Sequence, residues 1–411
     1  MSWDNRFATR TDNMQRSAVR EILKLTAKPD VISFAGGLPA PEYFPVERIQ
    51  QASDTVLQER GREVLQYSTS EGMPELRAWI AKRMSKDSQM AIHPDNILIL
   101  NGSQQALDLV GRVLLNEGDR VIVENPTYVG MLSAWKPNGP HFDAVPTDDD
   151  GLIVDELPAV IKQRVHKLLY SIPSFQNPQG TTLSLARRQR LAELLIEHDL
   201  PMYEDDPYGE LVFEGEKFPS VLEMEIQKRG AKSLDECNVM YAGTFSKTLA
   251  PGLRVGWIAA AYPVIDKMVQ AKQATDLHTS TLSQFIAYEI VRDDVFLDEH
   301  VALLRGVYRE RRDLMLQTMT EHFPEGIHWT VPRGGLFTMV TLPEGYDAAD
   351  VLREAVQHNV AFVPCNEFFI GETGRNAFRL NYSNARPERI VEGIRRLGAV
   401  LKTLMHASAH S

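Results

Sequence analysis

The sequence of 411 residues contains only two cysteines, Cys237 and Cys365. Two cysteines cannot build a disulfide framework, and nothing near either one has the spacing of a metal site. We therefore expect both thiols to pack in the interior of a cytoplasmic protein, where the environment is reducing. No metal ion is expected.

Long hydrophobic runs are also missing. No apolar stretch approaches the roughly 20 residues that a transmembrane helix needs, and the N-terminus lacks the apolar core of a signal peptide. The chain has 44 basic and 55 acidic residues, a net charge of −11, and so lacks the positive excess of a nucleic-acid-binding surface. The basic pairs Arg187-Arg188 and Arg311-Arg312 lie in helical patterns beside acids, and we expect solvated helix faces there. Neither a membrane nor a nucleic acid is an expected partner.

Two glycine-rich phosphate motifs are absent. Neither G-x-x-x-x-G-K-[ST] nor G-x-G-x-x-G occurs, which excludes a P-loop and weakens a nicotinamide interpretation. Short apolar segments instead alternate with amphipathic ones, a pattern that predicts an α/β fold with a mainly parallel sheet. Strands are predicted at 96–100, 121–124, 167–171 and 200–204, and helices at 104–115, 131–135 and 185–198.

The order of predicted helices and strands changes after Lys272. One long charged helical region is predicted at about 284–320, followed by strands at 335–342 and 379–382 and helices at 348–358 and 387–404. This α+β pattern of secondary structure predicts a separate C-terminal domain. We expect an N-terminal segment at 1–45 that packs against the rest, a large domain at 46–298 and a small domain at 299–411.

Lys247 lies in the stretch Y-A-G-T-F-S-K-T-L-A-P-G-L-R-V-G-W, among small and hydroxylated residues. A lysine in an apolar setting loses hydration, so its pKa falls and its neutral amine can condense with a carbonyl. The hydroxyls of Thr244 and Ser246, with Arg254, are groups that hold a phosphate. A surface lysine on a loop is the alternative for this stretch taken alone.

Two other segments offer polar groups at the ends of predicted strands. At Asn101-Gly-Ser-Gln-Gln, Ser103 is placed to cap a helix whose N–H groups form an anion site, although ordinary capping would also explain it. In Tyr203-Glu-Asp-Asp-Pro-Tyr-Gly, a buried carboxylate would need a cation such as a protonated ring nitrogen. Adjacent strand residues face opposite ways, so only Asp205 or Asp206 can point at one ring. Acids on a solvated loop are the alternative.

Three further residues suit a planar cofactor or its substrate. Asn177, before a proline and a glycine turn, can donate to a phenolate oxygen, and Tyr128 can stack on a ring; a routine turn and an unliganded core tyrosine are the alternatives. Arg379 lies in the strand-like run N-A-F-R-L-N-Y and needs a carboxylate, supplied by a substrate or by an internal salt bridge.

Taken together, seven segments resemble the fold-type I pyridoxal phosphate (PLP) enzymes, specifically the class I/II aminotransferases of the 2-aminoadipate (LysN), kynurenine and aromatic type. In chain order they are S-F-A-G-G-L-P, L-Q-Y-S, N-G-S-Q-Q-A-L-D-L, S-F-Q-N-P, E-D-D-P-Y, S-K-T-L-A-P-G-L-R-V-G and F-R-L-N-Y. The resemblance implies an aspartate aminotransferase-like fold, with a large α/β domain containing a mainly parallel mixed sheet and a smaller α+β domain. It also implies a homodimer with shared active sites.

The resemblance further implies a role for each matching residue. Lys247 would be the Schiff-base lysine and proton shuttle, and Asp205 would pair with the pyridine nitrogen. Asn177 and Tyr208 would bond the phenolate oxygen, while Tyr128 would stack on the ring. The phosphate would be held by Ser103, Gln104, Thr244, Ser246 and Arg254. Tyr67 would reach across the dimer, and Arg379 and the backbone at Gly37 would bind the substrate α-carboxylate.

The expected activity is transfer of an amino group from an α-amino acid to 2-oxoglutarate by a ping-pong route. An N-terminal helix resembling that of the aminoadipate enzymes would bring Arg20, with Ser17 one turn before it, toward the substrate side chain; a surface arginine is the alternative. The amino donor stays open among aminoadipate, aromatic and branched-chain types. Other PLP reactions (β-elimination, decarboxylation) are a second possibility, and a ligand-sensing regulator is a remote one, since few residues precede Gly36 and the charge is acidic.

Overall fold

Eight strands form a large sheet in the order β2-β9-β8-β7-β6-β3-β4-β5. The computed structural model describes residues 3–14, 22, 30–88, 90–371 and 373–408. Within this sheet only β9 and β5 run against their neighbours, which confirms the predicted α/β fold with a mainly parallel mixed sheet. The strands are β2 Ile97–Leu100, β3 Arg120–Asn125, β4 His141–Asp148, β5 Gly151–Leu152, β6 Leu168–Ser171, β7 Met202–Asp205, β8 Val239–Thr244 and β9 Gly256–Ala259.

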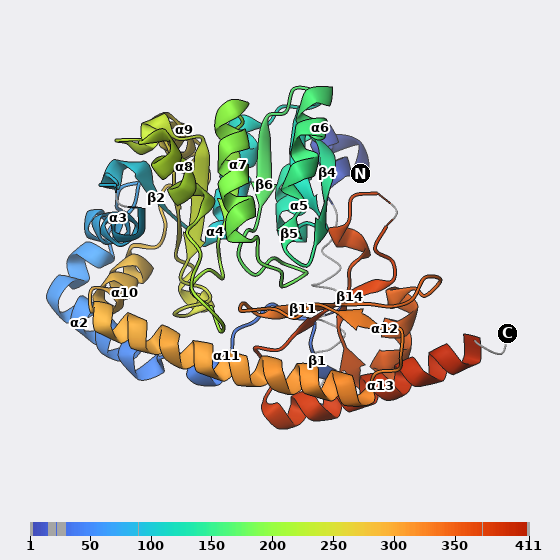
Figure 1. Cartoon of the computed structure of the whole chain (residues 1–411). Coiled ribbons are helices and arrows are strands. Elements are labelled where there is room, and N and C mark those ends of the chain that lie inside the picture. The colour runs from blue at the N-terminus through green and yellow to red at the C-terminus, as the bar shows by residue number, and fades with distance from the viewer. Residues whose placement is uncertain (1–2, 15–21, 23–29, 89, 372, 409–411) are drawn as a thin grey trace.

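Helices cover both faces of the large sheet (Figure 1). In β2 the alternation of the strand sends Leu98 and Leu100 into one core and Ile97 and Ile99 into the other. The first core includes α4, α5 and α9, and the second includes α2, α3, α7, α8 and α10. The bounds are α2 Val46–Val64, α3 Pro74–Ser88, α4 Ser103–Leu114, α5 Val129–Trp135, α6 Leu157–Gln163, α7 Leu185–Glu197, α8 Val221–Arg229, α9 Tyr262–Gln273 and α10 Thr281–Val291.

A second, antiparallel sheet has the order β10-β11-β14-β13, and a parallel pair joins β1 to β12. Helices α11, α12 and α13 accompany these strands, and Figure 1 shows α11 running from the large sheet beneath the small one. The predicted boundary at 298/299 falls inside α11, and the division into three parts stays a prediction. The bounds are β1 Ile32–Ser33, β10 His328–Trp329, β11 Phe337–Thr341, β12 Val360–Ala361, β13 Val363–Pro364, β14 Ala377–Asn381, α11 Asp294–His322, α12 Ala348–Gln357 and α13 Pro387–Ser408.

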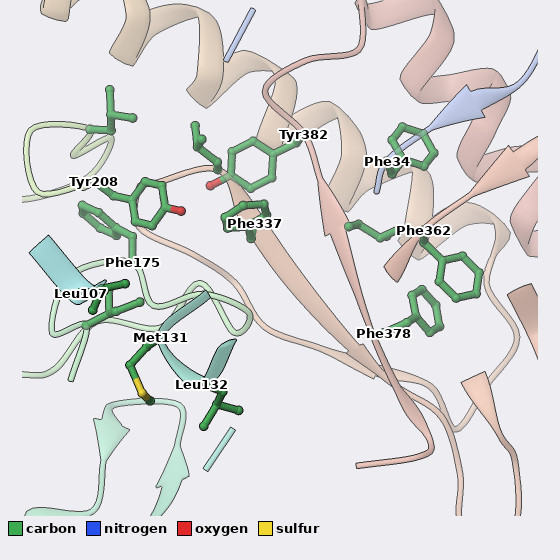
Figure 2. Close-up of a cluster of buried hydrophobic side chains, with 14 of the residues drawn as sticks. Phe34, Leu107, Met131, Leu132, Phe175, Tyr208, Phe337, Phe362, Phe378 and Tyr382 are labelled. Atoms are coloured by element: carbon green, nitrogen blue, oxygen red, sulfur yellow. The ribbon is translucent and has the colours of Figure 1, made fainter. Parts of the chain in front are cut away.

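The two sheets meet at an aromatic core. Figure 2 shows Phe337 of β11 beside Tyr208 and Phe175, which follow strands of the large sheet. The rings of Tyr208 and Phe337 meet edge to face with centroids 5.8 Å apart, an arrangement that aromatic quadrupoles favour. The carboxyl ends of β6 and β7 therefore face β11, and the polar residues that follow these strands are held between the sheets.

The helical region predicted at about 284–320 is confirmed, but it is divided between two helices. Helix α10 ends at Val291 and α11 begins at Asp294. Between them Asp293 caps α11, since its carboxylate accepts a hydrogen bond from the Phe296 N–H at 3.3 Å. An aspartate offers this side-chain acceptor in a non-helical conformation and so breaks a continuous helical pattern.

The prediction that the arginine pairs lie on solvated faces is wrong for three of the four residues. Arg188, Arg311 and Arg312 are buried. Arg188 donates to the carbonyls of residues 173, 183 and 219 and to a serine hydroxyl. Arg311 and Arg312 each combine a backbone carbonyl with a carboxylate. A guanidinium has five donors, so it can be buried when several acceptors converge on it.

Cys237 and Cys365 are buried and unpaired, as expected for packing residues. None of the described helices combines the length and the apolar character needed to cross a bilayer. In the part of the chain that the structure describes, no three His, Cys, Asp or Glu side chains gather as metal ligands.

Candidate active site

Lys247 lies in the loop between β8 and β9, and its partly buried ammonium donates to the carbonyl of Gly37 at 2.7 Å. Burial, followed by the positive charges of Arg379 and Arg254, lowers the pKa of Lys247 to about 8. A large share of the amine is then neutral near physiological pH, the state in which it can attack a carbonyl or accept a proton.

Asp205 ends strand β7 and is buried. Its Oδ2 accepts a hydrogen bond from the Tyr170 hydroxyl at 2.8 Å, whereas Oδ1 has no partner among the described residues. Burial, with a smaller contribution from Asp206, raises the pKa of Asp205 to about 7. A buried, half-satisfied carboxylate is costly and pairs readily with a cationic donor. Oδ1 therefore fits the protonated nitrogen of a heteroaromatic ring.

The neighbours of Asp205 face elsewhere, as the alternation of a strand requires. Asp206 accepts from the Tyr241 hydroxyl at 2.7 Å. Glu204 accepts from the backbone N–H groups of Val221 and Leu222, both at 2.9 Å, at the start of α8. The alternative of three acids on a solvated loop is therefore wrong, because Glu204 and Asp205 are buried strand residues.

Arg379 is a buried cation in the middle of β14. It donates to Asn177 Oδ1 at 2.7 Å and to the carbonyl of Ala35 at 2.8 Å, while its Nε has no partner in the described structure. Its guanidinium lies 4.2 Å from the ring centroid of Phe337 and 5.4 Å from that of Phe368. The groups that influence its pKa include no carboxylate. The alternative of an internal salt bridge thus finds no partner within the described residues.

Asn177, Tyr208 and Tyr128, which the sequence predicts to bind a cofactor ring, lie close enough together to influence one another. Tyr208 hydrogen-bonds with the side chain of Asn177, and burial raises its pKa far above the usual value. Tyr128 stands at the start of α5, and its ring leaves no room for a side chain at residue 130, where a Cβ would lie 2.4 Å from it. The hydrogen bond between Asn177 and Arg379 joins this group to the buried cation.

The predicted phosphate ligands come from two loops that meet at the start of α4. Arg254 donates to the carbonyl of Asn101 at 3.1 Å. A Cβ on Gly256 would lie 2.8 Å from the backbone N of Ser103. The Thr244 hydroxyl lies 2.9 Å from that of Ser246 and accepts from the Ser246 N–H at 3.1 Å.

One detail of this prediction is wrong. Gly102, with φ of 76°, is the N-cap of α4, and Ser103 is its first helical residue. The hydroxyl of Ser103 is therefore not spent on capping its own helix. Gln104, the next residue, donates from its side chain to the carbonyl of residue 130 at 3.0 Å. This hydrogen bond links α4 to α5.

Three predicted residues remain, one of them exposed at the surface and two outside the described residues. Tyr67 is 79% exposed and meets His278 edge to face with ring centroids 5.9 Å apart, so its side chain is not buried in the core. Ser17 and Arg20 lie outside the described residues. Their predicted contact with a substrate side chain stays a prediction.

Sequence reasoning missed Tyr170, the hydroxyl that anchors Asp205. The pairing of the strands would have revealed this contact. Tyr170 of β6 pairs with Tyr203 of β7, and Tyr203 lies two residues before Asp205 and therefore on the same face of the strand. It also missed the two aromatic rings around Arg379. They come from β11 and from the segment before β14, and no local pattern links those segments to an arginine.

Comparisons with known proteins identify the family of this chain. The family model of aminotransferase class I and II matches residues 29–397. A 2-aminoadipate transaminase from Thermus thermophilus is 42% identical over 98% of both chains. An aromatic-amino-acid aminotransferase from Thermococcus litoralis is 42% identical over 98% of this chain and 96% of its own. The solved structure of LysN from T. thermophilus, complexed with N-(5′-phosphopyridoxyl)-L-leucine, has a TM-score of 0.92 at 40% identity and covers 99% of this chain and all of its own.

Proposed function

Because the chain belongs to the class I and II aminotransferases and is therefore a PLP-dependent transaminase, we propose that it transfers the amino group of an α-amino acid to 2-oxoglutarate. The transfer follows a ping-pong route, in which each half-reaction uses the same residues in turn. The observation that carries this proposal is a set of five connected side chains. Arg379 hydrogen-bonds Asn177, and Asn177 hydrogen-bonds Tyr208. Lys247 lies within the electrostatic influence of Arg379, and Tyr208 lies within that of Asp205.

The residues present fit the cofactor. The unpartnered Oδ1 of Asp205 suits the ring nitrogen, and Asn177 and Tyr208 suit the phenolate oxygen. Tyr128 would stack on the ring. Ser103, Gln104, Thr244, Ser246 and Arg254 would hold the phosphate. When bound, the cofactor supplies a carbonyl for imine exchange and a ring that withdraws electrons from the substrate Cα.

The protein's own residues then bind the substrate and move its protons. Arg379 keeps three N–H donors beyond its two described hydrogen bonds, enough to bind an α-carboxylate bidentately. The carbonyl of Gly37 holds the Lys247 amine, and the adjacent backbone helps to bind the carboxylate. With its pKa near 8, Lys247 Nζ can take up the α-proton and return it without a large energetic penalty in either direction.

The substrate class is proposed from the relatives. The related proteins are named for 2-aminoadipate and for aromatic amino acids. We propose donors of the aminoadipate, aromatic and branched-chain types, with broad specificity. Arg20 would pair with an acidic side chain and swing aside for an apolar one.

The exposed Tyr67 supports a homodimer in which each subunit completes the other's site. A mixture of Lys247→Ala and Tyr67→Ala subunits tests this sharing. If sites are shared, mixed dimers regain activity that neither variant has alone; if mixing restores nothing, each site is complete within one chain. The cytoplasmic location stays a prediction.

The activity is tested with a donor panel and 2-oxoglutarate, by measuring glutamate formation against release of ammonia, pyruvate or CO₂. Wild type should form glutamate, and Lys247→Ala should lose turnover by several orders of magnitude, as expected for an essential nucleophile and base. Lys267→Ala, an exposed lysine on α9, is the matched control. Turnover that survives in Lys247→Ala contradicts the proposal. Arg20→Ala should lose acidic donors selectively.

A further inference from the structure

A partly buried ion pair lies behind the loop that begins α4. Lys272, near the end of α9, is fully buried, and its ammonium contacts both oxygens of Asp276 at 3.0 Å. The same ammonium donates to Gln105 Oε1 at 2.8 Å. A buried lysine needs such partners, since an uncompensated charge in the interior is strongly unfavourable.

Asp276 and Gln105 each accept a hydrogen bond from Asn101, and a third hydrogen bond joins Gln105 to Asp276. Asp276 Oδ2 accepts from Asn101 Nδ2 at 2.5 Å and from Gln105 Nε2 at 2.6 Å. Gln105 Oε1 accepts from the backbone N–H of Asn101 at 2.9 Å. The side chain of Asn101 is therefore held by Asp276, which follows α9, and its backbone N–H is held by Gln105 of α4.

Asn101 in turn fixes the groups proposed to hold the phosphate. Its carbonyl accepts from Arg254 at 3.1 Å, and the other described acceptor of that guanidinium, the carbonyl of Pro251, lies at 3.4 Å. Arg254 thus depends on Asn101 for its closer contact. Gly102, against which the guanidinium packs, separates Asn101 from the first residue of α4.

We propose that Lys272, Asp276 and Gln105 are positioning residues for the cofactor phosphate, acting through Asn101 on Arg254 and on the start of α4. Arg254 contacts the phosphate in this scheme, whereas the three residues of the network do not. Because hydrogen bonds to a phosphate depend steeply on donor placement, loss of the network weakens binding of the phosphate group in particular. The inference rests on the proposed assignment of the phosphate to Arg254 and Ser103.

The experiment compares two probes that differ only in the phosphate. Apoprotein is titrated with pyridoxal 5′-phosphate and with pyridoxal, and the dissociation constants are read from cofactor absorbance or tryptophan fluorescence. Asp276→Asn should weaken pyridoxal 5′-phosphate by about tenfold, the scale of one charge-assisted hydrogen bond. Pyridoxal binding should change much less. Inorganic phosphate should also become a weaker competitor.

A matched control is available in α8. Glu225 is buried and pairs with Arg229 at spacing i, i+4, as Lys272 pairs with Asp276. Glu225→Gln should lower stability without changing the ratio of the two dissociation constants. If Asp276→Asn does not fold, Gln105→Met removes the link to the Asn101 backbone while leaving the ion pair intact, and it should show the same selectivity.

Equal weakening of both probes, or no weakening of either, overturns the inference, since a purely structural role would not single out the phosphate. Arg254→Ala separates this failure from that of the underlying assignment. If Arg254→Ala leaves the ratio of the two constants unchanged, the proposed phosphate site is wrong. If it raises the dissociation constant of pyridoxal 5′-phosphate relative to that of pyridoxal and the network variants do not, only the positioning role fails.

Discussion

Removing the positive charge of Arg379 should make Lys247 a weaker nucleophile near neutral pH. Burial is the largest cause of the low pKa of Lys247, and the charge of Arg379 is the next. A nearby cation disfavours the protonated amine. In Arg379→Met the pKa of Lys247 should therefore rise above about 8, but stay below the usual value because the site remains buried.

The size of the effect follows from the neutral fraction of the amine. With a pKa of about 8, about a quarter of the amines are neutral at pH 7.5, against about one in a thousand for an ordinary lysine. The site thus gains roughly 200-fold in reactive amine. Each rise of half a pH unit in the titration midpoint should slow the reaction at pH 7.5 by about threefold, while the limiting rate at high pH is unchanged.

The assay is the rate of acylation of Lys247 in apoprotein as a function of pH, followed by mass spectrometry of the peptide that carries it. Wild type should titrate with a midpoint near 8 and Arg379→Met with a higher one. Arg333→Met, which removes a partly buried arginine that packs on Phe218, should leave the midpoint in place. A wild-type midpoint near 10, or a midpoint that stays or falls in Arg379→Met, would refute the reasoning.

Three further predictions test other parts of the structure. Cofactor affinity of apoprotein should fall as the pH drops through about 7, because Asp205 is then protonated and no longer attracts a cation; in Tyr170→Phe, which removes a hydrogen bond that lowers this pKa, the midpoint of the titration should move upward. Gly256→Ala should weaken cofactor retention measured by dialysis, since its Cβ would overlap the backbone at the start of α4. Unchanged retention would contradict this prediction and show that the backbone moves to accommodate the Cβ. Arg188→Met should cost about 3 kcal/mol in urea unfolding, because several buried carbonyls lose their donor, whereas Arg190→Met on the exposed face of the same helix should cost under about 0.5 kcal/mol.

The large sheet was predictable because its signal is local. Buried parallel strands are short apolar runs, and each polar residue that ends one of them stands out, as Asp205 does after Met202 and Tyr203. The rule that neighbouring strand residues face opposite ways correctly separated Asp205 from Asp206. Tyr170 escaped because its role depends on the pairing of β6 with β7. Strand order must be known before such a contact can be inferred.

The arginines show where sequence reasoning stops. Arg188, Arg311, Arg312 and Arg379 are the buried arginines of the described chain, yet in sequence the first three lie beside acids on helices and resemble surface residues. Their acceptors come from distant segments, such as the carbonyl of Pro332 for Arg312, and no periodicity contains that information. Burial of an arginine is therefore a property of the tertiary structure.

The surroundings of these four arginines also distinguish Arg379 from the other three. Arg311 and Arg312 hydrogen-bond carboxylates directly, and Arg188 lies within the influence of Glu204. Arg379 has instead an amide, a backbone carbonyl and two aromatic faces, with no described carboxylate near enough to affect its pKa. A buried charge without a counter-charge is unstable in isolation, and aromatic faces compensate it only in part. The missing carboxylate is best supplied from outside the chain, which is why Arg379 is the residue that we expect to bind the substrate.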